Sequence, residues 1–146
     1  MSDSTLAPGE EPPLASHLVT PRTFYAHHGI YVGNGRVIHY AGLAYGLRRG
    51  PVEEVSLERF AQGRSVDIRR DPRNFDSGEV VKRVRSRLGE SRYRLLTNNC
   101  AHLCAWALRD DCGMWRECVR RILRAVLEHY ERVTRHLRPM QADSRD

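Results

Sequence analysis

Residues 27–42 read HHGIYVGNGRVIHYAG and predict a β-hairpin. Apolar and polar side chains alternate on both sides of a glycine- and asparagine-rich turn at residues 33–35, a pattern typical of two antiparallel strands. Three histidines, His27, His28 and His39, lie within this hairpin. The hairpin therefore gathers several imidazole groups on one small piece of sheet.

The length of the turn decides which histidines share a face. A two-residue loop, residues 34–35, puts His28 on the same face as His39. A three-residue loop, residues 33–35 with a left-handed glycine at its end, puts His27 there instead. We favour the three-residue loop, because the opposite face is then almost wholly apolar and suits a core. That face carries His28 together with Ile30, Val32, Ile38 and Tyr40.

A second motif, TNNCAH at residues 97–102, places a cysteine at the expected start of a helix. Asn98 and Asn99 are good N-cap residues, and we expect the helix to run from about residue 99 to 109. A helix start favours an anion, and a neighbouring imidazole can accept the thiol proton, so both lower the thiol pKa from about 8.5. Cys100 is therefore the candidate nucleophile, and a hairpin histidine is its candidate base.

Composition excludes several other classes of protein. The chain has 24 basic and 18 acidic side chains, but no RNA- or DNA-binding motif and no aromatic residues alternating with the arginines, so we expect no nucleic-acid partner. The four cysteines match no zinc pattern, and no cofactor is implied. The chain has neither a run of about 18 apolar residues nor a signal-peptide pattern. We expect a cytoplasmic protein, with peripheral contact at the inner membrane surface as an alternative.

The domain organisation follows from changes in composition. Residues 1–16 are rich in Pro, Glu and Ser, and we expect a disordered tail. A catalytic domain is expected over residues 17–112 and an amphipathic helix over 113–138, followed by a tail at 139–146. We expect the helix to pack on its own domain or to form a homo-oligomer, with membrane contact as the alternative.

Shorter elements are predicted inside the domain. Residues 52–56 and 65–69 are typical of strands, residues 57–60 of one helical turn and residues 93–96 of an edge strand. Asp76 begins a helix that Gly89 ends. The predicted buried face of that helix consists of Val80, Val81, Val84 and Leu88.

Three motifs in this order resemble the lecithin:retinol acyltransferase (LRAT) domain family, its bacterial members most of all. They are Tyr25-x-His27-x-Gly29-Ile30-Tyr31-Val32-Gly33, Val37-Ile38-His39 and Asn98-Asn99-Cys100-x-His102, within residues 18–110. The resemblance implies an α+β fold of the permuted papain-like (NlpC-type) class. In that fold an antiparallel sheet bearing the histidines packs against a helix bearing the cysteine.

The resemblance also implies a role for each matched residue. Cys100 would be the nucleophile, His27 the general base and His39 the group that orients it. Tyr25 would line the oxyanion site, and Asn99 precedes the nucleophile as in the family. The implied chemistry is thiol-dependent acyl transfer or phospholipase A-type hydrolysis, with a phospholipid or other acyl-lipid as substrate and no cofactor.

The chain departs from the family pattern near the cysteine, and other functions stay open. Ala101 and Leu103 stand where the family has Glu and Phe, and the hydrophobic anchor of several eukaryotic members is missing. The alternatives are a cysteine amidase or peptidase of the same fold, and a non-catalytic binding domain.

Overall fold

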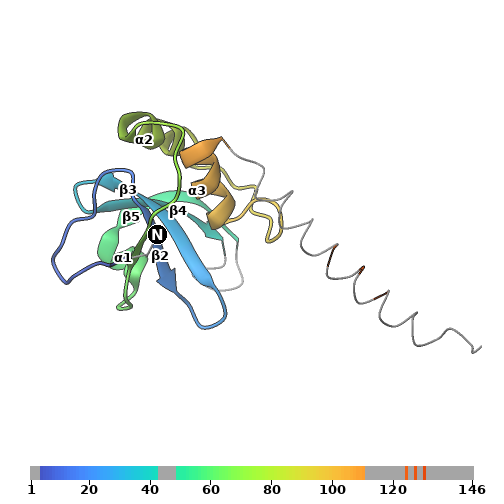
Figure 1. Cartoon of the computed structure of the whole chain (residues 1–146), viewed down its shortest axis with the longest axis horizontal. Coiled ribbons are helices and arrows are strands. Elements are labelled where there is room, and N and C mark those ends of the chain that lie inside the picture. Colours follow the sequence, from blue (N-terminus) through green and yellow to red (C-terminus); the bar gives the residue numbers. More distant parts are fainter. Residues whose placement is uncertain (1–3, 43–48, 111–123, 125–126, 128–129, 131–146) are drawn as a thin grey trace, which may run out of the picture. The chain divides into compact units, whose positions relative to one another are not determined.

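The computed structural model describes residues 4–42, 49–110 and the single positions 124, 127 and 130. Up to residue 110, the described chain combines one antiparallel sheet with three helices (Figure 1). The strands are β1 (Ser4–Thr5), β2 (His17–Pro21), β3 (Ala26–Gly33), β4 (Arg36–Gly42), β5 (Gly50–Ser56) and β6 (Asp67–Arg69). The helices are α1 (Leu57–Ala61), α2 (Ser77–Ser86) and α3 (Cys100–Arg109). The strand order is β1-β6-β2-β3-β4-β5, and all neighbouring strands are antiparallel.

The β3–β4 hairpin has the register predicted from a three-residue loop, but its turn consists of residues 34–35, because Gly33 still pairs with Arg36 and a bulge precedes it. Gly29 pairs with His39 and Ile30 pairs with Ile38, and the register shifts between Tyr31 and the turn. The last residue of β3 and both turn residues have positive φ values, which explains the two glycines and the asparagine: Gly33 89°, Asn34 53° and Gly35 65°. The turn chemistry therefore sets which histidines face which side.

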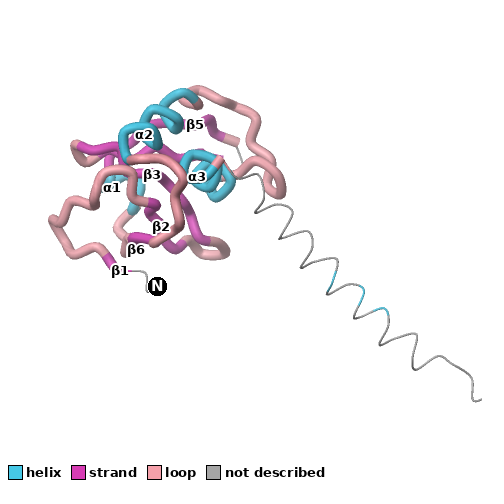
Figure 2. Tube along the Cα trace, turned by 45° about the horizontal axis from the view of Figure 1, so that its top comes forward, coloured by secondary structure: helices cyan, strands magenta, loops and turns pink. Residues whose placement is uncertain are grey.

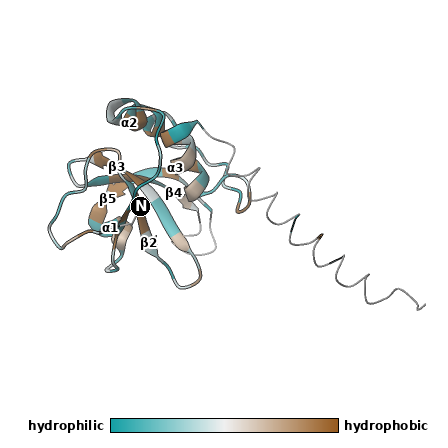
Figure 3. Ribbon diagram, viewed as in Figure 1, coloured by the Kyte–Doolittle hydropathy of each residue, from teal (hydrophilic) through white to brown (hydrophobic). Residues whose placement is uncertain are grey.

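The sheet separates two hydrophobic clusters. On one face the apolar residues predicted for the core pack against α2 and α3, and on the other Tyr31 and Val37 pack with Phe60 of α1. In Figures 1 and 2, α2 and α3 lie together on one side of the sheet and α1 lies on the other. Both α2 and α3 carry hydrophobic and hydrophilic positions in Figure 3, as expected for helices that bury one face.

Helix α2 begins as predicted and ends earlier. The Asp76 side chain caps it by accepting a hydrogen bond from the Glu79 N–H, 2.9 Å. Three of the four expected core residues are buried, namely Val80, Val81 and Val84. Leu88 is 43% exposed, because α2 ends at Ser86 and Leu88 follows in a turn.

Residues 4–16, the described part of the expected disordered tail at 1–16, are ordered. Within this part, β1 pairs with β6, Ala15 is fully buried, and the Glu11 carboxylate accepts hydrogen bonds from the Tyr31 hydroxyl (2.6 Å) and the Gly35 N–H (3.1 Å). These tertiary contacts offset the entropy of ordering the segment, which its composition alone does not suggest.

The predicted edge strand at residues 93–96 is also wrong. This segment forms a turn with one isolated bridge between Arg94 and Asn98. Leu95 is 62% exposed and Leu96 is 72% exposed, so no sheet covers these apolar side chains.

The chain divides into two compact units, residues 1–112 and 113–146. In the second unit, positions 124, 127 and 130 are helical. The rest of the expected C-terminal helix lies outside the described residues, so its packing stays a prediction. None of the helices described here is long and apolar enough to cross a membrane.

Candidate active site

Cys100 is the first residue of α3, and Asn99 is its N-cap. The Asn99 side chain accepts a hydrogen bond from the His102 N–H, 3.1 Å, which confirms the predicted helix start. The backbone N–H groups of His28, Ala101 and Cys100 lower the pKa of the Cys100 thiol, but burial has the larger effect and raises it above its ordinary value. The resting cysteine is therefore a neutral thiol at pH 7 and needs a base.

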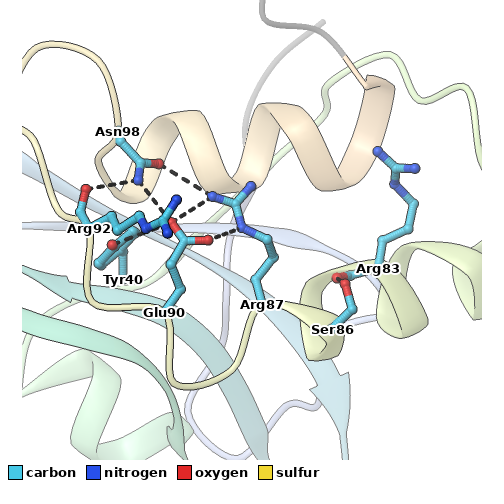
Figure 4. A network of polar contacts seen from close by, with 7 residues as sticks. All are labelled: Tyr40, Arg83, Ser86, Arg87, Glu90, Arg92 and Asn98. Atoms are coloured by element: carbon cyan, nitrogen blue, oxygen red, sulfur yellow. Dashed lines mark hydrogen bonds and ion pairs between the residues drawn. The ribbon is translucent and has the colours of Figure 1, made fainter.

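The loop before Cys100 is fixed by a polar network centred on Glu90 (Figure 4). The Asn98 amide donates to the Glu90 carboxylate (2.8 Å) and to the Arg92 carbonyl (2.9 Å), and the Arg87 guanidinium binds the same carboxylate. The bonds from Arg87 are the main reason that the pKa of Glu90 is lowered. Tyr40 on β4 also donates to Glu90, 3.4 Å. This network ties the loop to the sheet and so sets where α3 begins.

His27 and His39 form a buried pair, as the register predicts. The His27 Nε2 and His39 Nδ1 atoms are 2.7 Å apart, and the two residues are 2% and 1% exposed. Burial, and next the charge of His39, lower the pKa of His27 to about 3. Burial also lowers the pKa of His39 to about 4, against the opposing effect of Glu53. Both imidazoles are therefore neutral at pH 7.

Glu53 on β5 extends this pair, and the sequence did not point to it. It lies directly opposite His39 across the β4–β5 ladder, with its Oε1 atom 3.2 Å from His39 Nε2. A carboxylate favours a proton on the nitrogen that faces it, which leaves His39 Nδ1 as an acceptor. His27 Nε2 then donates to His39, and His27 Nδ1 remains as the basic nitrogen.

A second chain of the same kind lies on the neighbouring residue of β3. The His28 Nδ1 and His17 Nε2 atoms are 2.9 Å apart, and His17 Nδ1 bonds to the Asp71 carboxylate. Burial, and next His17, lower the pKa of His28 to about 4. His17 and Asp71 are 54 residues apart in sequence, and the pairing of His17 with Arg69 places His17 beside the end of β6, which Asp71 follows. This chain was missed because no local motif connects its members.

A pocket of about 330 Å³ opens at Cys100. Its polar part includes Tyr25, His28 and Asn99, and the rest of its lining consists of Phe24, Ala26, Tyr93, Leu95 and Ala101. Tyr25 joins the pocket to the buried pair, because its ring lies edge-on to His27 with the centroids 6.2 Å apart. The pocket therefore brings Tyr25 and Asn99 together with Cys100.

The structure does not bring the His27 and His39 rings to Cys100, because both rings lie against Phe60 on the face of the sheet opposite α3. Of the three hairpin histidines, His28 is the one that lines the Cys100 pocket. Among the described residues no hydrogen bond joins the Cys100 sulfur to an imidazole ring, whereas the backbone N–H of His28 on β3 does bond to it. Such bonds are often long in unliganded enzymes and tighten when substrate binds. In the part of the chain that the structure describes, no cluster of His, Cys, Asp or Glu is arranged to hold a metal ion.

Comparison with known proteins agrees with these motifs. The family model described as lecithin retinol acyltransferase matches residues 10–112, more than half of the chain. A search of curated proteins with this chain found no match. On the strength of the family match, the chain belongs to the lecithin retinol acyltransferase family.

Proposed function

We propose that this protein is a cysteine-dependent acyltransferase or phospholipase A-type hydrolase that acts on phospholipid esters through an acyl-enzyme at Cys100. The observation that carries the proposal is the pocket at the start of α3, where Cys100, Asn99 and Tyr25 lie together. The buried His27–His39 pair lies against Phe60 on the other face of the sheet, and Tyr25 contacts His27. The family supports acyl transfer as the chemistry, and the arrangement fits a permuted papain-like fold.

The first step forms the acyl-enzyme. His27 takes the proton of the Cys100 thiol, and the thiolate attacks the carbonyl carbon of the ester. A carbon–sulfur bond forms, the carbonyl electrons move to oxygen, and their return breaks the carbon–oxygen bond to the glycerol. The leaving oxygen takes the proton back from His27, so a lysophospholipid departs and His27 is neutral again.

The second step frees the enzyme. His27 removes a proton from the acceptor, whose oxygen or nitrogen attacks the thioester carbon, and the sulfur leaves as a thiolate that regains the proton. Water as acceptor gives a fatty acid, whereas an alcohol or an amine gives a transferred acyl group. His39 and Glu53 keep His27 in the tautomer that has a free Nδ1.

Two donors are available for the oxyanion. One is the Cys100 N–H at the start of α3, and the other is the Tyr25 hydroxyl in the same pocket. Burial raises the pKa of Tyr25, so its hydroxyl keeps its proton and can donate. A single donor of this kind stabilises a transition state by about 3 kcal/mol in other hydrolases.

The test compares two substrate classes on one preparation of the full chain. Phospholipid vesicles and a peptide mixture are incubated separately, and the release of lysophospholipid or of new amino groups is measured. We expect lysophospholipid release that Cys100→Ala abolishes and that the matched control Cys104→Ala retains. Amine release alone would identify an amidase or peptidase, and no release from either would favour a binding domain.

A further inference from the structure

Two concave surfaces meet at Tyr93. The first is the pocket at Cys100, and the second is a groove of about 680 Å³ that also contains Tyr93. Three arginines line the groove, Arg49, Arg92 and Arg94, together with Ser91, Thr97 and Asn98. An apolar pocket with a nucleophile thus lies beside a cationic groove.

The outer edge of the Cys100 pocket is unusually apolar. Phe24, in the turn between β2 and β3, is 95% exposed, and Leu95 and Leu96, in the loop before α3, are 62% and 72% exposed. Phe24 and Leu95 line the pocket itself. Single exposed apolar side chains are ordinary, but several that surround a pocket indicate an interaction site. We call Phe24, Leu95 and Leu96 the apolar rim.

The charges of the groove arginines are accessible to a binding partner. Arg49, Arg92 and Arg94 are all exposed, and among the described residues none of them forms an ion pair with a carboxylate. Other exposed arginines of the domain do have such partners, for example Arg36 with Glu54. Guanidinium groups bind phosphate oxygens in a bidentate manner, so the groove suits an anionic phosphate.

We propose that this combined surface docks on an anionic phospholipid membrane. The apolar rim inserts among the acyl chains, the three arginines bind lipid phosphates, and one acyl chain enters the Cys100 pocket. A lipid surface fits better than a protein partner because exposed apolar side chains stand beside a groove of three arginines, which matches the acyl chains and the phosphates of a phospholipid. The choice of a phospholipid as the reacting molecule rests on the proposed function, whereas the docking does not.

The arginines should make binding depend on the charge of the membrane. A basic side chain near an anionic surface strengthens binding by about fivefold. Loss of two of the three arginines should therefore weaken binding to anionic vesicles by about 25-fold. It should leave the weaker binding to neutral vesicles almost unchanged. Loss of the apolar rim should weaken binding to both kinds.

The experiment is vesicle sedimentation of the full chain carrying Cys100→Ala, so that no lipid is consumed. Vesicles of phosphatidylcholine are compared with vesicles that also contain phosphatidylglycerol. The test variants are Arg92→Gln/Arg94→Gln and Leu95→Ser/Leu96→Ser, with Phe24→Ser as an independent variant in case the leucine pair disturbs folding. The matched controls are Arg70→Gln/Lys82→Gln and Leu88→Ser, which lie on exposed positions outside both concave surfaces.

We expect the arginine pair to lose the preference for phosphatidylglycerol and the rim variants to lose binding, with both controls unchanged. Equal binding to the two vesicles by the parent protein, or the same loss in the controls, would overturn the docking proposal. The proposed function has its own readout in this design, the hydrolysis of a short-chain soluble ester by the wild-type chain. If that hydrolysis is absent while the vesicle pattern holds, the docking stands and the proposed function fails.

Discussion

Three buried histidines should make the fold sensitive to mild acid. The pKa is about 3 for His27 and about 4 for His28 and His39 in the folded protein, against about 6.5 in the unfolded chain. Below pH 6.5 the unfolded state therefore binds more protons than the folded state. The stability that the neutral histidines contribute is complete above pH 6.5. It decreases as the pH falls below 6.5, until the folded-state pKa values are reached.

The size of the effect follows from the number of protons. Each histidine reduces the free energy of unfolding by about 1.4 kcal/mol per pH unit once its unfolded form is protonated. Three together give a slope of about 4 kcal/mol per pH unit near pH 5.5 and a total loss of about 6 kcal/mol at pH 5. An ordinary domain has only about 5–15 kcal/mol of stability. We therefore expect the domain to unfold close to pH 5.

Urea unfolding of the full chain between pH 7.5 and 5 measures this slope directly. The carboxylates of Asp71 and Glu90, whose pKa values are lowered in the fold, add to the loss only at more acidic pH. His28→Gln should reduce the slope by about one third, because Gln does not bind a proton in this pH range. A free energy of unfolding that stays constant from pH 7.5 to 5 would show that these rings are not held neutral by burial.

Further predictions concern the site and the sheet. His27→Ala should remove nearly all turnover, and His39→Asn should remove less because an amide can still orient the base. His28→Ala should retain turnover. A folded but inactive His28→Ala together with an active His27→Ala would make His28, not His27, the base. Iodoacetamide should label Cys100 faster than the fully buried Cys104. The labelling rate of Cys100 should rise up to and beyond pH 9, because burial raises the pKa of the Cys100 thiol. A plateau near pH 7 would indicate a thiolate–imidazolium pair instead. Gly29→Ala should destabilise the domain by about 1–3 kcal/mol in thermal unfolding. The reason is that a Cβ at residue 29 would lie 2.6 Å from Val37 Cγ1 and 2.9 Å from Phe60 Cε2. An unchanged melting temperature would contradict this packing.

The sequence alone predicted the features that local chemistry controls. The two glycines at the hairpin turn require positive φ values, and these set the register that pairs His27 with His39. Asn99 caps α3 because its short side chain can accept from a free N–H of the first turn. In each case the determining residues lie within a few positions of each other.

Features that depend on strand order were missed. Glu53 meets His39 only because β5 lies beside β4, and Asp71 meets His17 only after β6 has paired with β2. Residues 4–16 were misjudged for the same reason, since Ala15 is buried by distant parts of the chain. Composition reports the cost of ordering a segment but not the contacts that offset it.

The most direct test of the central claim is the intact mass of the full chain after incubation with mixed phospholipid vesicles, followed by peptide mapping. We predict a mass increase of one acyl group, located on Cys100, sensitive to hydroxylamine as a thioester is, and absent in Cys100→Ala. An acyl group on another residue, or lysophospholipid release that continues in Cys100→Ala, would contradict the assignment of Cys100 as the nucleophile.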